Sequence, residues 1–119
     1  MIRPDQNLKV YLCKEPVDMR KQMDGLAVLV ESELELNPFD PALFVFCNRQ
    51  KDKIKILFWE RNGFVVWYKR LESERFKWPK SFSDTGILTL TSQELNWLLD
   101  GYDLSVMQPH KTLYYQSVG

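Results

Sequence analysis

The sequence has few of the side chains that usually perform covalent or metal chemistry. It contains only two cysteines and one histidine in 119 residues. Cys13 and Cys47 end the apolar runs VYLC and LFVFC, and neither has another cysteine at a metal-binding spacing. Two cysteines do not make a disulfide scaffold in a chain of this size, so both are interpreted as buried structural thiols. His110 has no serine or cysteine partner nearby and is interpreted as a solvated residue.

The motifs of the common catalytic sites are also missing. The sequence contains neither a glycine-rich dinucleotide fingerprint nor a phosphate-binding loop. Glu31 and Glu35 are four residues apart, but a metal ion there would need further ligands. A polynucleotidyl transferase needs several carboxylates around two metals, and no such set accompanies the basic part of this chain. The sequence therefore predicts no catalytic residues, no metal, no cofactor and no small-molecule substrate, and a protein that is not an enzyme.

Long apolar runs and net charge are absent as well. The first residues, MIRPDQNLK, lack the apolar stretch of a signal peptide, and no run approaches the ~20 apolar residues of a membrane span. We therefore expect a soluble cytoplasmic protein without a membrane partner. The formal net charge of zero means that no overall field favours nucleic acid or membrane.

The chain nevertheless has ample material for a core, with 45% hydrophobic and 13% aromatic residues. We predict a single α+β domain over residues 1–104, followed by a loosely ordered C-terminal tail, 105–119, where no periodicity is found. Its strand-like runs are residues 8–13, 42–48, 53–61, 64–71 and 86–91. We expect these to form an antiparallel β-meander sheet centred on residues 42–71.

Two helices are predicted beside this sheet. Asp18 is the expected N-cap of a long helix that runs to about Leu36 and packs on one face of the sheet. Thr91 and Glu94 form a capping box that begins a short C-terminal helix. The leucines of this helix face inward, and Gly101 ends it.

The segment DKIKILFWERNGFVVWYKRLE, residues 52–72, is predicted to be a hairpin with a type I′ turn at Asn62-Gly63, which pairs Arg61 with Phe64. Side chains alternate along a strand, so one face is mainly apolar and is the expected core side, covered by the long helix. The other face mixes rings with cations: Lys53, Lys55, Leu57, Trp59, Arg61, Phe64, Val66, Tyr68 and Arg70.

This mixed face has two interpretations. Rings can stack on bases while cations bind phosphates, and residues 47–80 hold ten basic and four acidic side chains, a net charge of +6. Alternatively, residues 76–79 and 86–91 cover the rings, and the Lys and Arg stems extend past them. Under the first interpretation the residues that bind nucleic acid or a partner are Arg49, Lys53, Lys55, Trp59, Arg61, Tyr68 and Arg70.

Longer motifs resemble a known family. PVDMRKQMDGL (16–26), LNPFDPALFVFCNRQKDKIKILFWERNGFVVWYKRLE (36–72), RFKWP (75–79) and LTSQELNWLLDGYD (90–103) are similar to the TnpB-type accessory protein of bacterial insertion-sequence family sixty-six, over roughly residues 8–104. The matching positions include Asn48, Arg49, Lys55, Trp59, Gly63, Trp67, Tyr68, Lys69, Arg70, Phe76, Trp78 and Pro79. The sequence departs from the commoner pattern at Gln22, where a glycine is frequent, and at Gln50, where a basic residue is frequent.

The resemblance implies a protein that is needed beside a separate transposase for movement of its element, and it assigns no chemical step. Two functions follow as hypotheses. In one, the protein contacts DNA of the element ends through the basic aromatic hairpin. In the other, it is a protein–protein adaptor for the transposase or the companion accessory protein and does not touch DNA.

Overall fold

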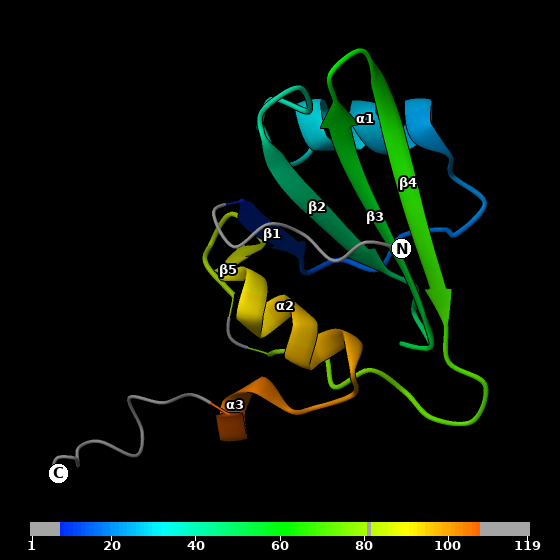
Figure 1. Ribbon diagram of the computed structural model, residues 1–119, viewed down its shortest axis with the longest axis vertical. Coiled ribbons are helices and arrows are strands. Elements are labelled where there is room, and N and C mark those ends of the chain that lie inside the picture. The colour runs from blue at the N-terminus through cyan, green and yellow to red at the C-terminus, as the bar shows by residue number, and fades with distance from the viewer. Residues whose placement is uncertain (1–7, 81, 108–119) are drawn as a thin grey trace, which may run out of the picture.

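A computed structural model describes residues 8–80 and 82–107 of the chain. Five strands form one sheet in the order β4-β3-β2-β1-β5 (Figure 1). The strands are β1 (Lys9–Cys13), β2 (Ala42–Cys47), β3 (Lys53–Glu60), β4 (Gly63–Arg70) and β5 (Ile87–Leu90). The helices are α1 (Met23–Ser32), α2 (Ser92–Leu99) and α3 (Leu104–Met107). The predicted α+β class is confirmed, and all five predicted strands are present.

The sheet is mixed, so the prediction of a purely antiparallel sheet was wrong. Strand β1 pairs with β2 in parallel, whereas the β1–β5, β2–β3 and β3–β4 pairs are antiparallel. Parallel neighbours need a long crossover connection, and the segment between β1 and β2, which contains α1, provides it. Such a pair has no turn motif in the sequence from which it could be predicted, because a helical segment and not a hairpin turn joins the two strands.

The predicted long helix was also wrong, because α1 has only ten residues. Asp18 is not its N-cap: the cap position is Gln22, which makes no side-chain cap hydrogen bond. Asp18 instead accepts hydrogen bonds from the backbone N–H and the guanidinium of Arg20, which hold a separate turn before the helix. Beyond the helix, Glu35 has a φ of 56°, a left-handed value that a right-handed helix cannot contain. The helix therefore ends before Leu36.

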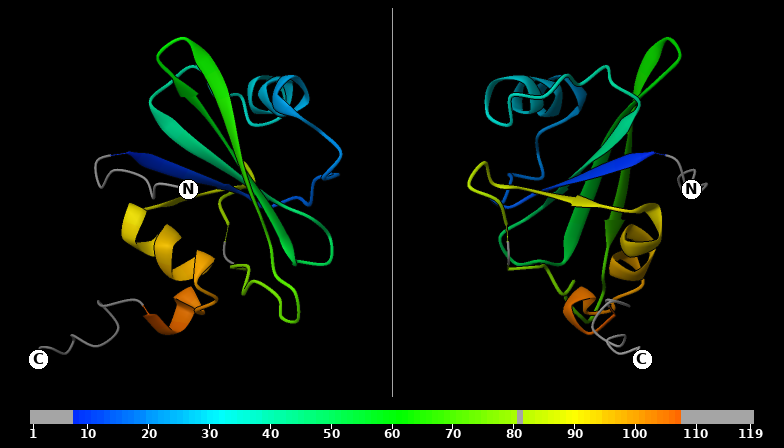
Figure 2. Two further views of the ribbon diagram at one scale, coloured as in Figure 1. Left: turned by 45° about the vertical axis from the view of Figure 1, so that its right-hand side comes forward. Right: turned by 90° about the vertical axis from the view of Figure 1, so that its left-hand side faces the viewer.

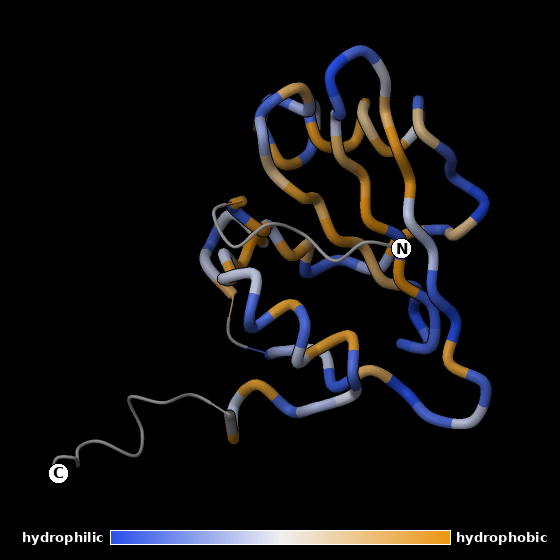
Figure 3. The backbone as a smooth tube through the Cα atoms, viewed as in Figure 1, coloured by the Kyte–Doolittle hydropathy of each residue, from blue (hydrophilic) through white to orange (hydrophobic). Residues whose placement is uncertain are grey.

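Helices cover both faces of the sheet, and α1 lies on the face opposite to the predicted one (Figure 2). Leu26 and Val30 of α1 pack with Phe44, Phe46 and neighbours in a core cluster that also includes Leu57, Phe64 and Val66 of the hairpin. The other face holds the larger core cluster, with buried residues from α2, α3 and residue 76. In Figure 3 the central strands are largely hydrophobic and the connecting loops largely hydrophilic. The mixed face is thus a core face along part of its length.

The β3–β4 hairpin is present, but its register differs from the prediction by two residues. Gly63 pairs with Glu60, so Arg61 and Asn62 form the two-residue loop. The predicted type I′ turn was wrong, since Arg61 has the positive φ of the turn, 57°, and Asn62 and Gly63 do not. An even shift leaves every side chain on its predicted face, whereas a shift of one residue would have exchanged the faces.

The short C-terminal helix is confirmed with its caps. Thr91 and Glu94 make both hydrogen bonds of a capping box. Gly101, with a φ of 96°, donates to the Leu98 carbonyl, and Tyr102 donates to the Trp97 carbonyl, which is the hydrogen-bond pattern of a Schellman motif. Residues 105–107 of the predicted tail belong to α3, while 108–119, including His110, lie outside the described residues.

Two further sequence interpretations concern burial. Cys13 and Cys47 are both buried free thiols, as predicted. Burial raises the pKa of both thiols, that of Cys47 to about 12, so both are protonated and unreactive at neutral pH. Among residues 8–80 and 82–107, no helix has the length and apolar character needed to cross a membrane.

The capping box gives a direct test of the α2 assignment. We expect Thr91→Ala to lower the free energy of unfolding by about 1 kcal/mol, because the Glu94 N–H loses its side-chain acceptor at the helix start. Urea denaturation of the purified protein measures this change. Gln93→Ala, an exposed position in the same helix, is the control and should change stability by less than about 0.5 kcal/mol. Equal effects of the two substitutions would contradict the assignment.

Candidate nucleic-acid interface

The buried side chain of Asn48 organises the loop between β2 and β3. Its Oδ1 accepts hydrogen bonds from the backbone N–H groups of Asp52 and Lys53, at 3.1 and 3.0 Å. Its Nδ2 donates to Asp52 Oδ1 at 2.6 Å and to Gln50 Oε1 at 3.2 Å. One amide therefore satisfies four groups of the loop. It fixes the backbone that presents the exposed side chains of Arg49 and Gln50.

The same loop is joined to the chain that follows the hairpin. Leu71 donates its N–H to the Asp52 carbonyl at 2.8 Å, and Phe76 donates to the Lys51 carbonyl at 2.7 Å. The Phe76 side chain is buried in the larger core cluster. Trp78 donates its indole N–H to the Cys13 carbonyl at 3.2 Å. Residues of the RFKWP motif thus hold the loop and the end of β1 in place.

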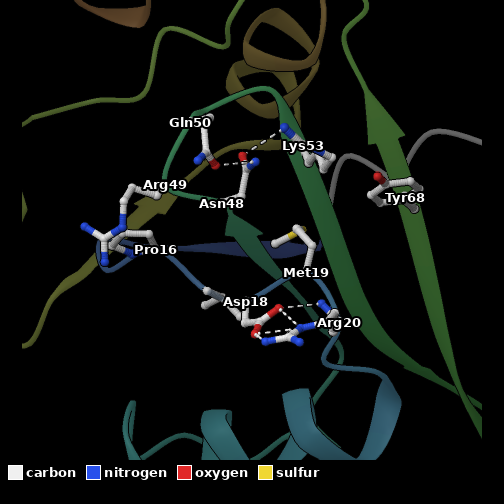
Figure 4. A pocket seen from close by; sticks show the side chains of 10 residues that line it. Pro16, Asp18, Met19, Arg20, Asn48, Arg49, Gln50, Lys53 and Tyr68 are labelled. Atoms are coloured by element: carbon white, nitrogen blue, oxygen red, sulfur yellow. Dashed lines mark hydrogen bonds and ion pairs between the residues drawn. The ribbon is translucent and has the colours of Figure 1, made fainter.

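A pocket of about 480 Å³ lies beside this loop (Figure 4). Its walls come from the turn before α1, from the Asn48 loop and from the adjoining ends of β3 and β4. The lining residues are Pro16, Val17, Asp18, Met19, Arg20, Asn48, Arg49, Gln50, Lys53 and Tyr68.

The lining of this pocket is positively charged, with three cations against one carboxylate. Asp18 is held by the Arg20 guanidinium at 2.7 Å, and these hydrogen bonds lower the pKa of the Asp18 carboxyl to about 2. Nearby, hydrogen bonding from Asn48 lowers the pKa of Asp52, whose carboxylate lies 3.5 Å from Lys53 Nζ. Arg49 makes no ion pair with any described residue. Its charge is therefore available to an anionic ligand.

The predicted binding residues fall into two groups. Arg49, Lys53 and Tyr68 line the pocket together. Arg70 lies opposite Lys53 in the β3–β4 ladder and pairs with Glu72 at 3.1 Å. Lys55 has a structural partner: its Nζ donates to the carbonyls of residues 19 and 21, at 2.7 and 2.8 Å. It therefore holds the turn that forms one pocket wall, and its ammonium also lies 5.8 Å from the Tyr68 ring centroid.

Trp59 and Arg61 lie at the other end of the hairpin. A strand rises about 3.3 Å per residue, so the tip of β3 is about 23 Å from Lys53. The Trp59 ring packs edge-on against Phe39 and Phe64, with centroids 4.9 and 5.0 Å apart. The covering residues come from the α1 side of the sheet. Residues 76–79 and 86–91, the predicted covers, contribute to the core cluster of the opposite face. The Trp59 ring is partly buried at this end, whereas Tyr68 is 48% exposed at the other.

Sequence reasoning missed the contribution of residues 16–20. Asp18 was predicted to be a helix N-cap, and Arg20 was not among the predicted binding residues. The available signal was the Asp-x-Arg spacing, because aspartate often accepts the backbone N–H two residues on in a turn. Sequence reasoning also missed the role of Asn48 as the centre of the loop.

The described residues contain no group of three or more His, Cys, Asp and Glu side chains that could hold a metal ion. The pocket itself presents guanidinium and ammonium groups that can bind an anion, and an exposed phenol ring that can stack.

The Asn48 network predicts a specific loss of stability. We expect Asn48→Ala to lower the free energy of unfolding by about 2 kcal/mol, because two backbone donors and a carboxylate lose their partner. Gln50→Ala removes one hydrogen bond of the same network from an exposed position and is the control, with an expected change below about 0.5 kcal/mol. Chemical denaturation measures both. A mild effect of Asn48→Ala, equal to that of the control, would show that the loop does not depend on this amide.

Comparison with known proteins agrees with the motifs. The family model described as IS66 Orf2 like protein matches residues 8–109. The chain is 34% identical over 103 residues to the uncharacterized protein y4hO of Sinorhizobium fredii (strain NBRC 101917 / NGR234), covering 87% of this chain and 88% of that protein. It is 33% identical to the uncharacterized protein y4jC of the same strain, covering 87% and 86%. No solved structure matches the chain.

The family match covers all the described residues, including the Asn48 loop, the β3–β4 hairpin and the RFKWP anchor. The chain therefore belongs to the IS66 Orf2-like family, whose members are accessory proteins of insertion-sequence transposition.

Proposed function

We propose that this protein acts beside a separate transposase without catalysing a step itself, and that it contacts DNA of the element ends through the pocket end of the hairpin. The proposed interface consists of Arg20, Arg49, Lys53, Tyr68 and Arg70. Exposed cations close to an exposed ring are the composition that proteins use to bind phosphates and bases.

One observation supports this assignment above the others. Most motif residues have an evident structural role, because Asn48 holds the loop, Trp78 caps the end of β1, and Lys69 donates to the Leu99 carbonyl at the end of α2. Among the residues that the structure describes, the Arg49 side chain makes no hydrogen bond or ion pair and the Tyr68 ring contacts the Lys55 ammonium, and both line one pocket. Side chains that the fold does not need are the best candidates for contact with another molecule.

The salt dependence of binding tests this proposal. We expect labelled element-end DNA to bind at low salt, and its affinity to fall linearly with salt on a double-logarithmic scale. Arg49→Gln should weaken binding and reduce the slope by about 1, because one phosphate contact is lost. Arg61→Gln, which changes another exposed arginine, at the hairpin tip, is the matched control and should change neither quantity. Fluorescence anisotropy at several ionic strengths measures both.

Two results would contradict the proposal. An absence of binding at the lowest salt concentration would remove DNA contact altogether. If Arg61→Gln lowers the affinity for DNA as much as Arg49→Gln does, the contact with DNA is not specific to the pocket.

A second function, a protein–protein adaptor, is favoured by the other end of the hairpin. Phe39 packs against Trp59 and Phe64 and remains 52% exposed. Clustered aromatic side chains with an exposed edge are typical of the anchor residues of protein interfaces. The partner in this case is the transposase or the companion accessory protein of the same element.

The adaptor function predicts a complex with the transposase that survives nuclease treatment. Phe39→Ala should weaken this complex about tenfold or more, because an exposed anchor ring would be lost. Tyr102→Ala removes a ring of equal exposure, 52%, from the chain after α2 and should have no effect. A pull-down with purified, nuclease-treated proteins, followed by titration, measures the change. A complex that disappears with the nuclease would exclude the adaptor function.

A further inference from the structure

We propose that the pocket beside the Asn48 loop holds one unpaired nucleotide, with its base on the Tyr68 ring and a flanking phosphate at Arg49 and Arg20. The protein would then bind single-stranded DNA in preference to duplex. This inference rests on the proposed function and makes it narrower, because it names the form of DNA.

The Tyr68 ring has the properties of a stacking platform. It lies on β4, an edge strand of the sheet, it borders the pocket, and it is 48% exposed. The Lys55 ammonium lies 5.8 Å from its centroid and is held by two backbone carbonyls. This arrangement fixes the charge over one face of the ring.

The cations of the pocket come from separate walls. Arg49 comes from the loop that Asn48 holds, and Arg20 comes from the turn that Lys55 and Asp18 hold. The carboxylate of Asp18 engages Nε and Nη2 of Arg20, whereas Nη1 donates to no described residue. The Arg20 side chain is 92% exposed. Both guanidinium groups thus keep donors for a phosphate oxygen, on supports that are already ordered.

Two features favour an unpaired nucleotide over duplex DNA. The bases of a duplex are stacked and expose only their edges in the grooves, so they cannot cover the Tyr68 ring. A duplex phosphate alone would use the rim arginines and leave about 480 Å³ of pocket, with apolar lining from Pro16, Val17 and Met19, unfilled. An unstacked base provides the flat apolar face that this lining accepts. A peptide made of acidic residues alone would satisfy the arginines but has no ring to stack on Tyr68.

The experiment compares one labelled oligothymidylate of twelve nucleotides with a labelled duplex of equal length, by anisotropy at low salt. We expect tighter binding of the single strand. Tyr68→Ala should weaken single-strand binding about 5- to 150-fold, the range for loss of one stacked base, with little effect on the duplex. Tyr68→Phe keeps the ring and should bind as the unaltered protein does. Tyr102→Ala is the matched control, and circular dichroism confirms that each variant is folded.

The outcomes separate this inference from the proposed function. Equal binding of both DNA forms, with Tyr68→Ala harmless, would overturn the nucleotide pocket and leave salt-dependent DNA contact intact. If neither DNA form binds at low salt, both the nucleotide pocket and the proposed DNA contact are overturned. Competition by a polyglutamate peptide as strong as that by unlabelled oligothymidylate would also overturn the inference, in favour of an acidic peptide ligand.

Discussion

The hydrogen bonds of the Asn48 side chain are the constraint on which the site depends. They fix the connection between β2 and β3, and that connection in turn receives the N–H groups of Leu71 and Phe76 from the chain after β4. A loop with few buried apolar contacts would otherwise sample many conformations, at an entropic cost for any ligand that had to order it. With the loop held, Arg49 is presented from a defined backbone position. The network also joins the pocket to the core through the buried ring of Phe76.

The mixed face of the hairpin illustrates how one strand serves two purposes. Near its middle, Leu57 and Val66 pack beneath α1, which buries the apolar part of that face. Lys55 remains there because its ammonium reaches two backbone carbonyls that would otherwise need other donors. A charged group is accepted in such a place only when it is hydrogen-bonded. Lys55 is therefore a structural residue, although in the sequence it alternates with aromatic residues in the way expected of a lysine that binds phosphate.

The limits of sequence reasoning follow from which interactions are local. Strands, the capping box at Thr91 and the Gly101 terminus were all predictable, because alternation and capping act within a few residues. The parallel β1–β2 pair, and with it the face that α1 covers, depends on contacts between distant segments. The hairpin turn lies between these cases: the chain does reverse beside Asn62-Gly63, yet positive φ falls on Arg61. The predicted face of each hairpin side chain was still right, because the register differed by an even number of residues.

The same distinction applies to the site. The sequence pattern grouped Arg49, Lys53 and Tyr68, which line one pocket. It also included Trp59 and Arg61, which the length of β3 puts about 23 Å from Lys53. Pattern could not include Arg20, since the turn that carries it reaches the pocket only through the crossover between parallel strands. This separation has a functional consequence. A hairpin with a cationic pocket at one end and an aromatic tip at the other can contact two molecules at once, because neither surface shares a side chain with the other. In the proposed function, DNA contact and partner contact would be complementary roles of a single strand pair.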